Sequence, residues 1–77
     1  MSEATKLAAE ASSRDPHAGL SAVAALRRLL ERLEALQVHN ARLQGWSWKA
    51  IAEELGVSKQ AVHRKHAGRR LLGGRGR

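Results

Sequence analysis

The sequence predicts an all-α protein with one long helix followed by two short ones. Its apolar residues are almost all Leu, Ala, Val and Trp, and it has no Phe or Tyr, a composition that favours helices over strands. Apolar residues recur at three- and four-residue steps through the middle of the chain, as they do along one face of a helix. Serines and glycines follow where short helices would begin and end. We therefore predict helices at about 16–44, 48–55 and 59–67.

The long helix has clear start and stop signals. Asp15 can cap its first turn, and Pro16 is tolerated at the first helical position because its missing N–H would have no partner inside the helix. Gly19 weakens this turn, so the firm start is either Pro16 or Ser21. Gly45 is predicted to end the helix in the left-handed conformation.

The apolar stripe of the long helix extends beyond what two short helices can cover. Leu36 and Leu43 are expected to close a core with them. Asn40 shares a heptad position with Leu26 and Leu33, and it either fixes the register of a partner helix or faces solvent. The remaining apolar residues predict an interaction surface, made of Val23, Leu26, Leu29, Leu30 and Leu33.

Each short helix has a serine cap and a pair of apolar residues that can bracket its first turn. Ser47 precedes the second helix, where Trp46 can pack on Ile51 as a hydrophobic staple. Ser58 precedes the third helix, which has an equivalent pair in Val57 and Val62, and Gly68 is expected to close it. The buried side chains of the second helix are expected to be Trp48, Ile51, Ala52 and Leu55.

Positive charge is concentrated at the C-terminal end of the chain, whose formal net charge is +7. No acidic residue follows Gly56, whereas seven basic residues do: Lys59, Arg64, Lys65, Arg69, Arg70, Arg75 and Arg77. Such a one-signed segment attracts a polyanion, and nucleic acid is a better candidate than an anionic membrane surface. No apolar run approaches the roughly 20 residues that span a bilayer, so no membrane segment is expected.

The stretch WKAIAEELGVSKQAVHRKHA, residues 48–67, resembles the helix-turn-helix of bacterial regulators and of the DNA-binding region 4 of sigma factors. Ala52 stands where the two helices of this motif approach most closely, and Gly56 stands at the positive-φ turn between them. The apolar positions that lock the two helices together are occupied by Ile51, Leu55, Val57 and Val62. The resemblance implies a three-helix DNA-binding domain.

The resemblance also implies roles for polar side chains in the range 47–70. The third helix of such motifs enters the major groove with its N-terminal end, and the preceding helix crosses the DNA backbone. This implies base contacts from Lys59, Gln60, His63 and Arg64. It implies phosphate contacts from Ser47, Lys49, Ser58, Lys65, Arg69 and Arg70.

One position departs from the motif, near the end of the third helix. A further apolar residue is usual there, whereas this chain has Arg64-Lys65-His66. Either the His66 ring fills the place half-buried, or the helix is loosely held until DNA binds. His63 and His66 have a spacing that also suits a metal, but without Cys or a flanking carboxylate we expect no metal site.

The two ends of the chain are predicted to lie outside the domain at 15–68. Residues 1–14 are rich in Ala, Ser and Glu, and we expect them to be mostly disordered. Residues 69–77 form a Gly/Arg tail in which Arg75 and Arg77 flank Gly76. This triplet resembles the centre of minor-groove AT-hook arms but lacks the following Pro, so the tail either enters the minor groove or makes loose phosphate contacts.

Together these patterns predict a homodimeric, sequence-specific regulator of transcription that binds double-stranded DNA in the cytoplasm, at the nucleoid. The alternative is an adaptor that docks a regulator or a polymerase subunit on the long helix while its basic half keeps it on the nucleoid. No nucleophile, base and orienting acid can be assembled from these residues, and no phosphate-binding glycine loop is present, so neither an enzyme activity nor a cofactor is expected.

Overall fold

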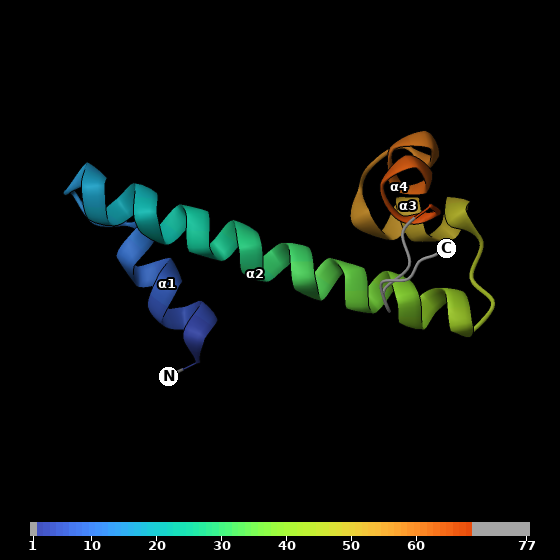
Figure 1. Ribbon diagram of the computed structural model, residues 1–77, viewed down its shortest axis with the longest axis horizontal. Coiled ribbons are helices and arrows are strands. Elements are labelled where there is room, and N and C mark those ends of the chain that lie inside the picture. Colours follow the sequence, from blue (N-terminus) through green and yellow to red (C-terminus); the bar gives the residue numbers. More distant parts are fainter. Residues whose placement is uncertain (1, 69–77) are drawn as a thin grey trace. The chain divides into compact units, whose positions relative to one another are not determined.

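The computed structural model describes residues 2–68, and these residues form four helices and no strand (Figure 1). They are α1 (Glu3–Ala11), α2 (Pro16–Leu43), α3 (Trp48–Leu55) and α4 (Lys59–His66). The all-α prediction is confirmed, and the bounds of α2, α3 and α4 agree with the predicted ones to within one residue. The chain divides into two compact units, Met1–Leu33 (unit 1) and Glu34–Arg77 (unit 2). The division falls inside α2, whereas the sequence predicted a boundary at residue 14.

Helix α1 replaces the disordered segment that was predicted for residues 1–14. Ser2 caps it, because its Oγ accepts a hydrogen bond from the backbone N–H of Thr5 at 3.1 Å. The helix consists mainly of Ala, Glu, Lys and Leu, which are strong helix formers. The prediction was wrong because it required a bulky apolar face, whereas the Ser2 cap and high intrinsic propensity favour this helix and its end lies against α2.

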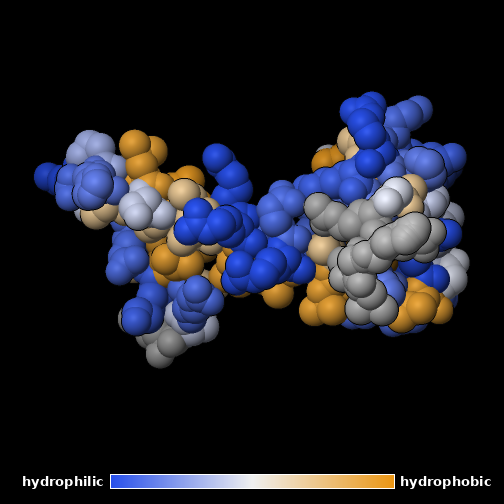
Figure 2. Space-filling view, viewed as in Figure 1, coloured by the Kyte–Doolittle hydropathy of each residue, from blue (hydrophilic) through white to orange (hydrophobic). Residues whose placement is uncertain are grey.

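In unit 1, the end of α1 approaches the first turns of α2. Asp15 caps α2 as predicted, since its Oδ1 accepts from the N–H of His17 at 3.2 Å. Gly19 is buried, and a Cβ added there would lie 3.5 Å from the carbonyl oxygen of Ser13. Ala22 is buried as well, and Figure 2 shows apolar side chains gathered where α1 and this part of α2 meet. A glycine in the first turn of α2 therefore allows a close approach of the preceding backbone.

Unit 2 contains the core of the helix-turn-helix. The buried apolar residues that pack together in this core are Val38 from α2, Ile51 and Ala52 from α3, and Val62 from α4. Ala41 and Trp48 pack against this cluster and are partly buried. The small residue expected at the closest approach of the two short helices, Ala52, is thus in the centre of the core.

Three leucines that were predicted to be buried in this core are exposed instead. Leu36 and Leu43 of α2 are 48% and 73% exposed, and Leu55 of α3 is 42% exposed. Val38 and Ala41 take the place that the prediction gave to the two α2 leucines. The face of α2 that meets α3 and α4 therefore carries the smaller side chains.

Two successive turns of unit 2 use the same local device. Gly45 (φ 89°) and Gly56 (φ 74°) each end a helix in the left-handed conformation, which only glycine adopts without strain. In each turn the following N–H, from Trp46 or Val57, bonds back to the helix, to the carbonyl of Ala41 (2.9 Å) or of Ala52 (3.1 Å) respectively. The next residue is a serine that caps the following helix. The order glycine, apolar residue, serine thus sets the two bends that place α3 and α4.

Candidate nucleic-acid interface

Helix α4 is held by one face and exposes the other. Val62 and His66, four residues apart, are its buried side chains. The serine cap predicted for this helix is present, since Ser58 Oγ accepts from the N–H of Ala61 at 3.0 Å. The four residues predicted to contact bases are all exposed: Lys59, Gln60, His63 and Arg64. The structure thus brings them together on α4 as the sequence predicted, and their role in binding stays a prediction.

The start of α3, the helix that precedes α4, carries two of the residues that are predicted to contact phosphate. Ser47 and Lys49 are both exposed. Ser47 Oγ accepts from the N–H of Ala50 at 3.0 Å, so this serine caps α3. A hydroxyl that accepts in a cap keeps its own hydrogen for a phosphate oxygen. The same applies to Ser58 at the start of α4.

The end of α4 is tied to α2 through Glu34. His66 is buried, with 7% of its surface exposed, and its Nε2 lies 2.6 Å from Glu34 Oε2. Lys65 Nζ lies 3.1 Å from the same oxygen. The ring of His66 thus fills the position where the motif usually has an apolar residue, which was the first of the two alternatives, and it is buried more fully than expected. Lys65, predicted to contact phosphate, is engaged in this ion pair.

Glu34 is the electrostatic centre of that attachment. The hydrogen bond from His66 is the main cause that lowers the pKa of Glu34 below its ordinary value. Lys65 acts in the same direction by hydrogen bonding and by its charge, whereas partial burial opposes them. The carboxylate is therefore ionised at neutral pH and can accept both hydrogen bonds.

Three side chains from three helices of unit 2 form a stack that the sequence did not predict. The guanidinium carbon of Arg42 in α2 lies 4.6 Å from the centre of the Trp48 ring in α3. The His63 ring in α4 meets the same indole edge-on, with 5.3 Å between ring centres and 82° between planes. Arg42 also donates a hydrogen bond from a guanidinium nitrogen to the carbonyl oxygen of Trp46 at 2.7 Å. No motif or spacing marks Arg42, because its role depends on how α2 meets α3.

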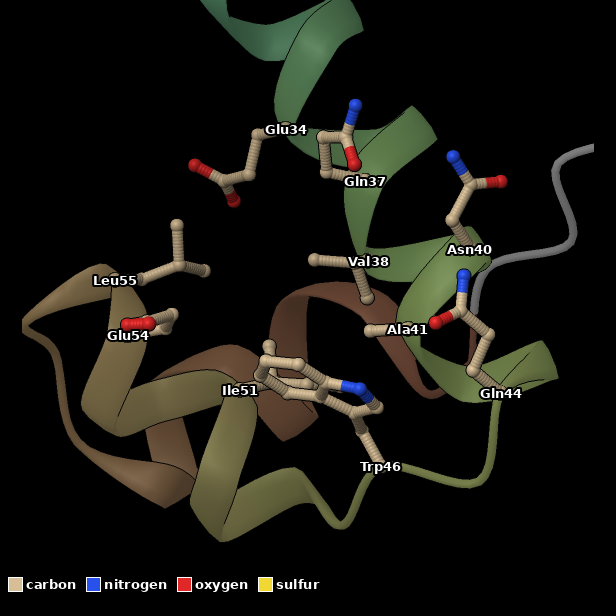
Figure 3. Close-up of a pocket in the computed structure, with 10 residues that line it drawn as sticks. All are labelled: Glu34, Gln37, Val38, Asn40, Ala41, Gln44, Trp46, Ile51, Glu54 and Leu55. Carbon is tan, nitrogen blue, oxygen red and sulfur yellow. The ribbon is translucent and has the colours of Figure 1, made fainter.

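A groove of about 220 Å³ lies between α2 and α3 (Figure 3). Its apolar walls are Val38 and Ala41 on one side and Ile51 and Leu55 on the other, with Trp46 at one end. Trp46 and Ile51 both line it, which places the two members of the predicted staple on one surface. Polar and acidic side chains complete the lining: Glu34, Gln37, Asn40, Gln44 and Glu54. No residue of α4 contributes to it.

Part of the predicted site lies outside the described residues: Arg69, Arg70, Arg75 and Arg77. Among residues 2–68, no three His, Asp or Glu side chains are grouped so that they could hold a metal ion. In the same range, no helix has the length and apolar character needed to cross a membrane.

Comparison with known proteins identifies the family. Searches of curated proteins and of solved structures returned no match. A family model described as a homeodomain-like domain matches residues 26–66, which is more than half of the chain. The match includes α3, α4 and most of α2, from residue 26 onward, together with the two glycine turns and serine caps described above. The chain is therefore a member of the homeodomain-like family, whose helix-turn-helix binds DNA.

Proposed function

We propose that this protein is a homodimeric regulator of transcription that reads a specific duplex DNA sequence with α4 in the major groove. The observation that carries the proposal is the division of α4 into a buried face and an exposed face. The exposed face carries a lysine, a glutamine, a histidine and an arginine, which are side chains that bond base edges. The role is non-catalytic, and we place the protein in the cytoplasm, at the nucleoid. A bacterial regulator resembling sigma-factor region 4 is the type that residues 48–67 favour.

Within this proposal, the residues of unit 2 have separate tasks. Gln60 pairs with an adenine edge, and Lys59 or Arg64 bonds the N7 and O6 atoms of guanine. His63 adds a further base contact. Ser47, Lys49 and Ser58 bind phosphates and so set the register of α4 on the duplex. Lys65 has a smaller part in phosphate binding than the sequence suggests, since Glu34 already binds it. The tail beyond Gly68 contributes further phosphate contacts.

Selection of binding sites from random DNA tests this function, followed by titration of single-residue variants. Gln60→Ala and Arg64→Ala should each weaken binding to the selected site by about 1–3 kcal/mol and relax the preference at one base pair. Lys49→Ala should weaken binding to every sequence alike and lower the salt dependence.

Arg32→Ala is the matched control for Arg64→Ala. It removes the same charge from an exposed position in unit 1. Arg32→Ala should not change the preference for the selected DNA over random DNA. If Arg64→Ala also leaves this preference unchanged, Arg64 is not a base reader.

The proposed dimer forms through α2. Of the five residues predicted for the interface, Leu30 and Leu33 are 62% and 45% exposed. The other three, Val23, Leu26 and Leu29, are half-buried within the single chain. Exposed leucines on a helix of a small protein favour association, and a two-fold symmetric dimer matches the paired half-sites that helix-turn-helix proteins read.

Sedimentation equilibrium tests the dimer. Leu30→Lys combined with Leu33→Lys should convert it to a monomer, because two buried apolar contacts become charges in each copy. Both residues are exposed in the single chain, so the fold of the monomer should be kept. Ser21→Lys combined with Ala24→Lys adds the same charge at exposed positions of the same helix and should leave the dimer intact. An unmutated chain that is monomeric at tens of micromolar contradicts the proposal.

The groove between α2 and α3 favours a second candidate function, that of a protein-binding adaptor. The groove has apolar walls with polar and acidic residues around them, is open to solvent, and is formed without α4, so a partner that occupies it leaves α4 accessible to DNA. The selection experiment separates the two functions. An enriched DNA sequence supports the regulator, whereas binding without any enriched sequence supports the adaptor.

A further inference from the structure

We propose that Arg42 and Trp48 position the His63 ring to read one base pair, so that Arg42 determines DNA specificity without touching DNA. This inference rests on the proposed function. It concerns the stack of three side chains in unit 2, in which α2 supplies Arg42, α3 supplies Trp48 and α4 supplies His63.

Arg42 is held at two points. One guanidinium nitrogen donates to the carbonyl oxygen of Trp46 at 2.7 Å, a charge-assisted hydrogen bond of short length. Its guanidinium carbon lies 4.6 Å from the centre of the Trp48 ring, within the range of a cation–π interaction. Because the guanidinium is planar and rigid, these two contacts together define its plane. Arg42 therefore stabilises the indole of Trp48 in one orientation.

The oriented indole of Trp48 in turn restricts the orientation of the His63 ring. The indole is half-buried and packs against the core of unit 2, so one part of it is fixed by the fold. The His63 ring meets it edge-on at 5.3 Å, which is a favourable geometry for two aromatic rings. An exposed histidine on a helix would otherwise sample a broad range of ring rotations. The contact with Trp48 selects one range and so directs the two ring nitrogens.

Direction matters because the two nitrogens of a neutral imidazole are not equivalent. One donates a hydrogen bond and the other accepts one, so a fixed ring presents a defined pattern to the major groove. A freely rotating ring could satisfy more than one base pair, and it would also lose rotational freedom on binding. A ring held in place before binding discriminates better for the same number of contacts.

The competing interpretation is that Arg42 is itself a phosphate contact, since it is exposed and always charged. The two interpretations predict different results. A lost phosphate contact weakens binding to all sequences alike and lowers the log–log salt slope by about 0.9. A lost positioning residue lowers the preference at the base pair that His63 reads and leaves the salt slope unchanged.

The experiment measures binding of the full chain to its selected duplex and to duplexes that carry each single-base change. The variants are His63→Ala, Arg42→Met and the combination of both, with Arg32→Met as matched control from unit 1. His63→Ala should abolish the preference at one base pair. Arg42→Met should lower that same preference roughly two- to tenfold, the factor that corresponds to one aromatic contact. In the combined variant, Arg42→Met should cause no further loss of preference.

A second measurement needs no DNA. The ring-proton NMR signals of His63 in the free protein should shift in Arg42→Met and more strongly in Trp48→Phe, and they should not shift in Arg32→Met. Thermal melting confirms that each variant is folded.

The proposal is overturned if the His63 signals do not move, if Arg42→Met lowers the salt slope, or if the losses in the combined variant add. In these three cases the proposed function stands as long as a DNA sequence is enriched. If the unmutated protein enriches no sequence, the function and this inference fail together.

Discussion

Replacing Ile51 with Ala is expected to destabilise unit 2 by about 2–5 kcal/mol, which is a large part of the stability of any small domain. Ile51 is buried between α2 and α4, where it packs with Val38, Ala52 and Val62. No large side chain of the described residues is completely buried, so the core has few other contacts that could compensate. Urea unfolding followed by circular dichroism measures the loss.

Leu55→Ala is the matched control, because it removes a similar side chain from the same helix. The sequence predicted both residues to be buried, yet 42% of Leu55 is exposed. Its replacement should cost less than half as much as that of Ile51, since less apolar surface leaves water on folding. Equal losses for the two variants would mean that the burial pattern described for α3 is incorrect.

Replacing Glu34 with Ala is expected to cost about 1.5–3 kcal/mol, the range for hydrogen bonds that involve a charged group. The substitution leaves the Nε2 atom of His66 without its carboxylate partner in a buried position, and it also removes the ion pair with Lys65. Thermal unfolding of the two proteins at neutral pH measures this loss. Lys65→Met, which removes only the more exposed partner, should cost much less.

The contribution of Glu34 also has a predictable pH dependence. Its pKa is lowered in the folded protein, so the folded state binds this proton less readily than the unfolded state does. The stabilisation is therefore complete above the ordinary glutamate value of 4.5 and is lost as the pH falls through the lowered value. In Glu34→Gln this loss should be absent, and the difference in melting temperature between the two proteins should shrink at acid pH. A difference in melting temperature that stays constant from pH 7 to pH 3 would contradict this pH dependence.

The helices and turns of unit 2 could be predicted from the sequence because their signals are local. Ser47, Ser58, Gly45 and Gly56 each act within a few residues of their own position, through caps and a left-handed backbone. The exposed face of α4 followed from the same information, since Val62 and the turn before it define which side is buried.

The buried face of α2 could not be predicted in this way. Apolar residues occur on more than one face of this helix, so periodicity alone does not say which face meets α3 and α4. Short helices that approach closely need side chains smaller than leucine at the contact, and Val38 and Ala41 provide them. The choice is made by the packing of α3 and α4, which is a non-local property.

The contacts that complete the candidate site are also non-local. Glu34 and His66 are separated by 32 positions, and no local pattern in the sequence indicates that these two residues meet. Arg42 and His63 meet through Trp48, and only the crossing of three helices brings them together. The sequence indicates which residues of α4 are exposed, but it does not indicate which residues of α2 and α3 contact them.

The few buried side chains of α4 have a consequence for how the protein opens. Detaching α4 exposes its own buried side chains, Val62 and His66, and the core surface that Val62 covers, whereas unfolding the whole unit also exposes the contacts between α2 and α3. The free energy of this local opening is therefore lower than that of global unfolding, and the backbone amides of α4 exchange their hydrogens with solvent through it. A duplex that binds only the closed form slows this exchange in proportion to its occupancy. The helix proposed to enter the major groove is thus also the one whose amide protection most directly reports DNA binding.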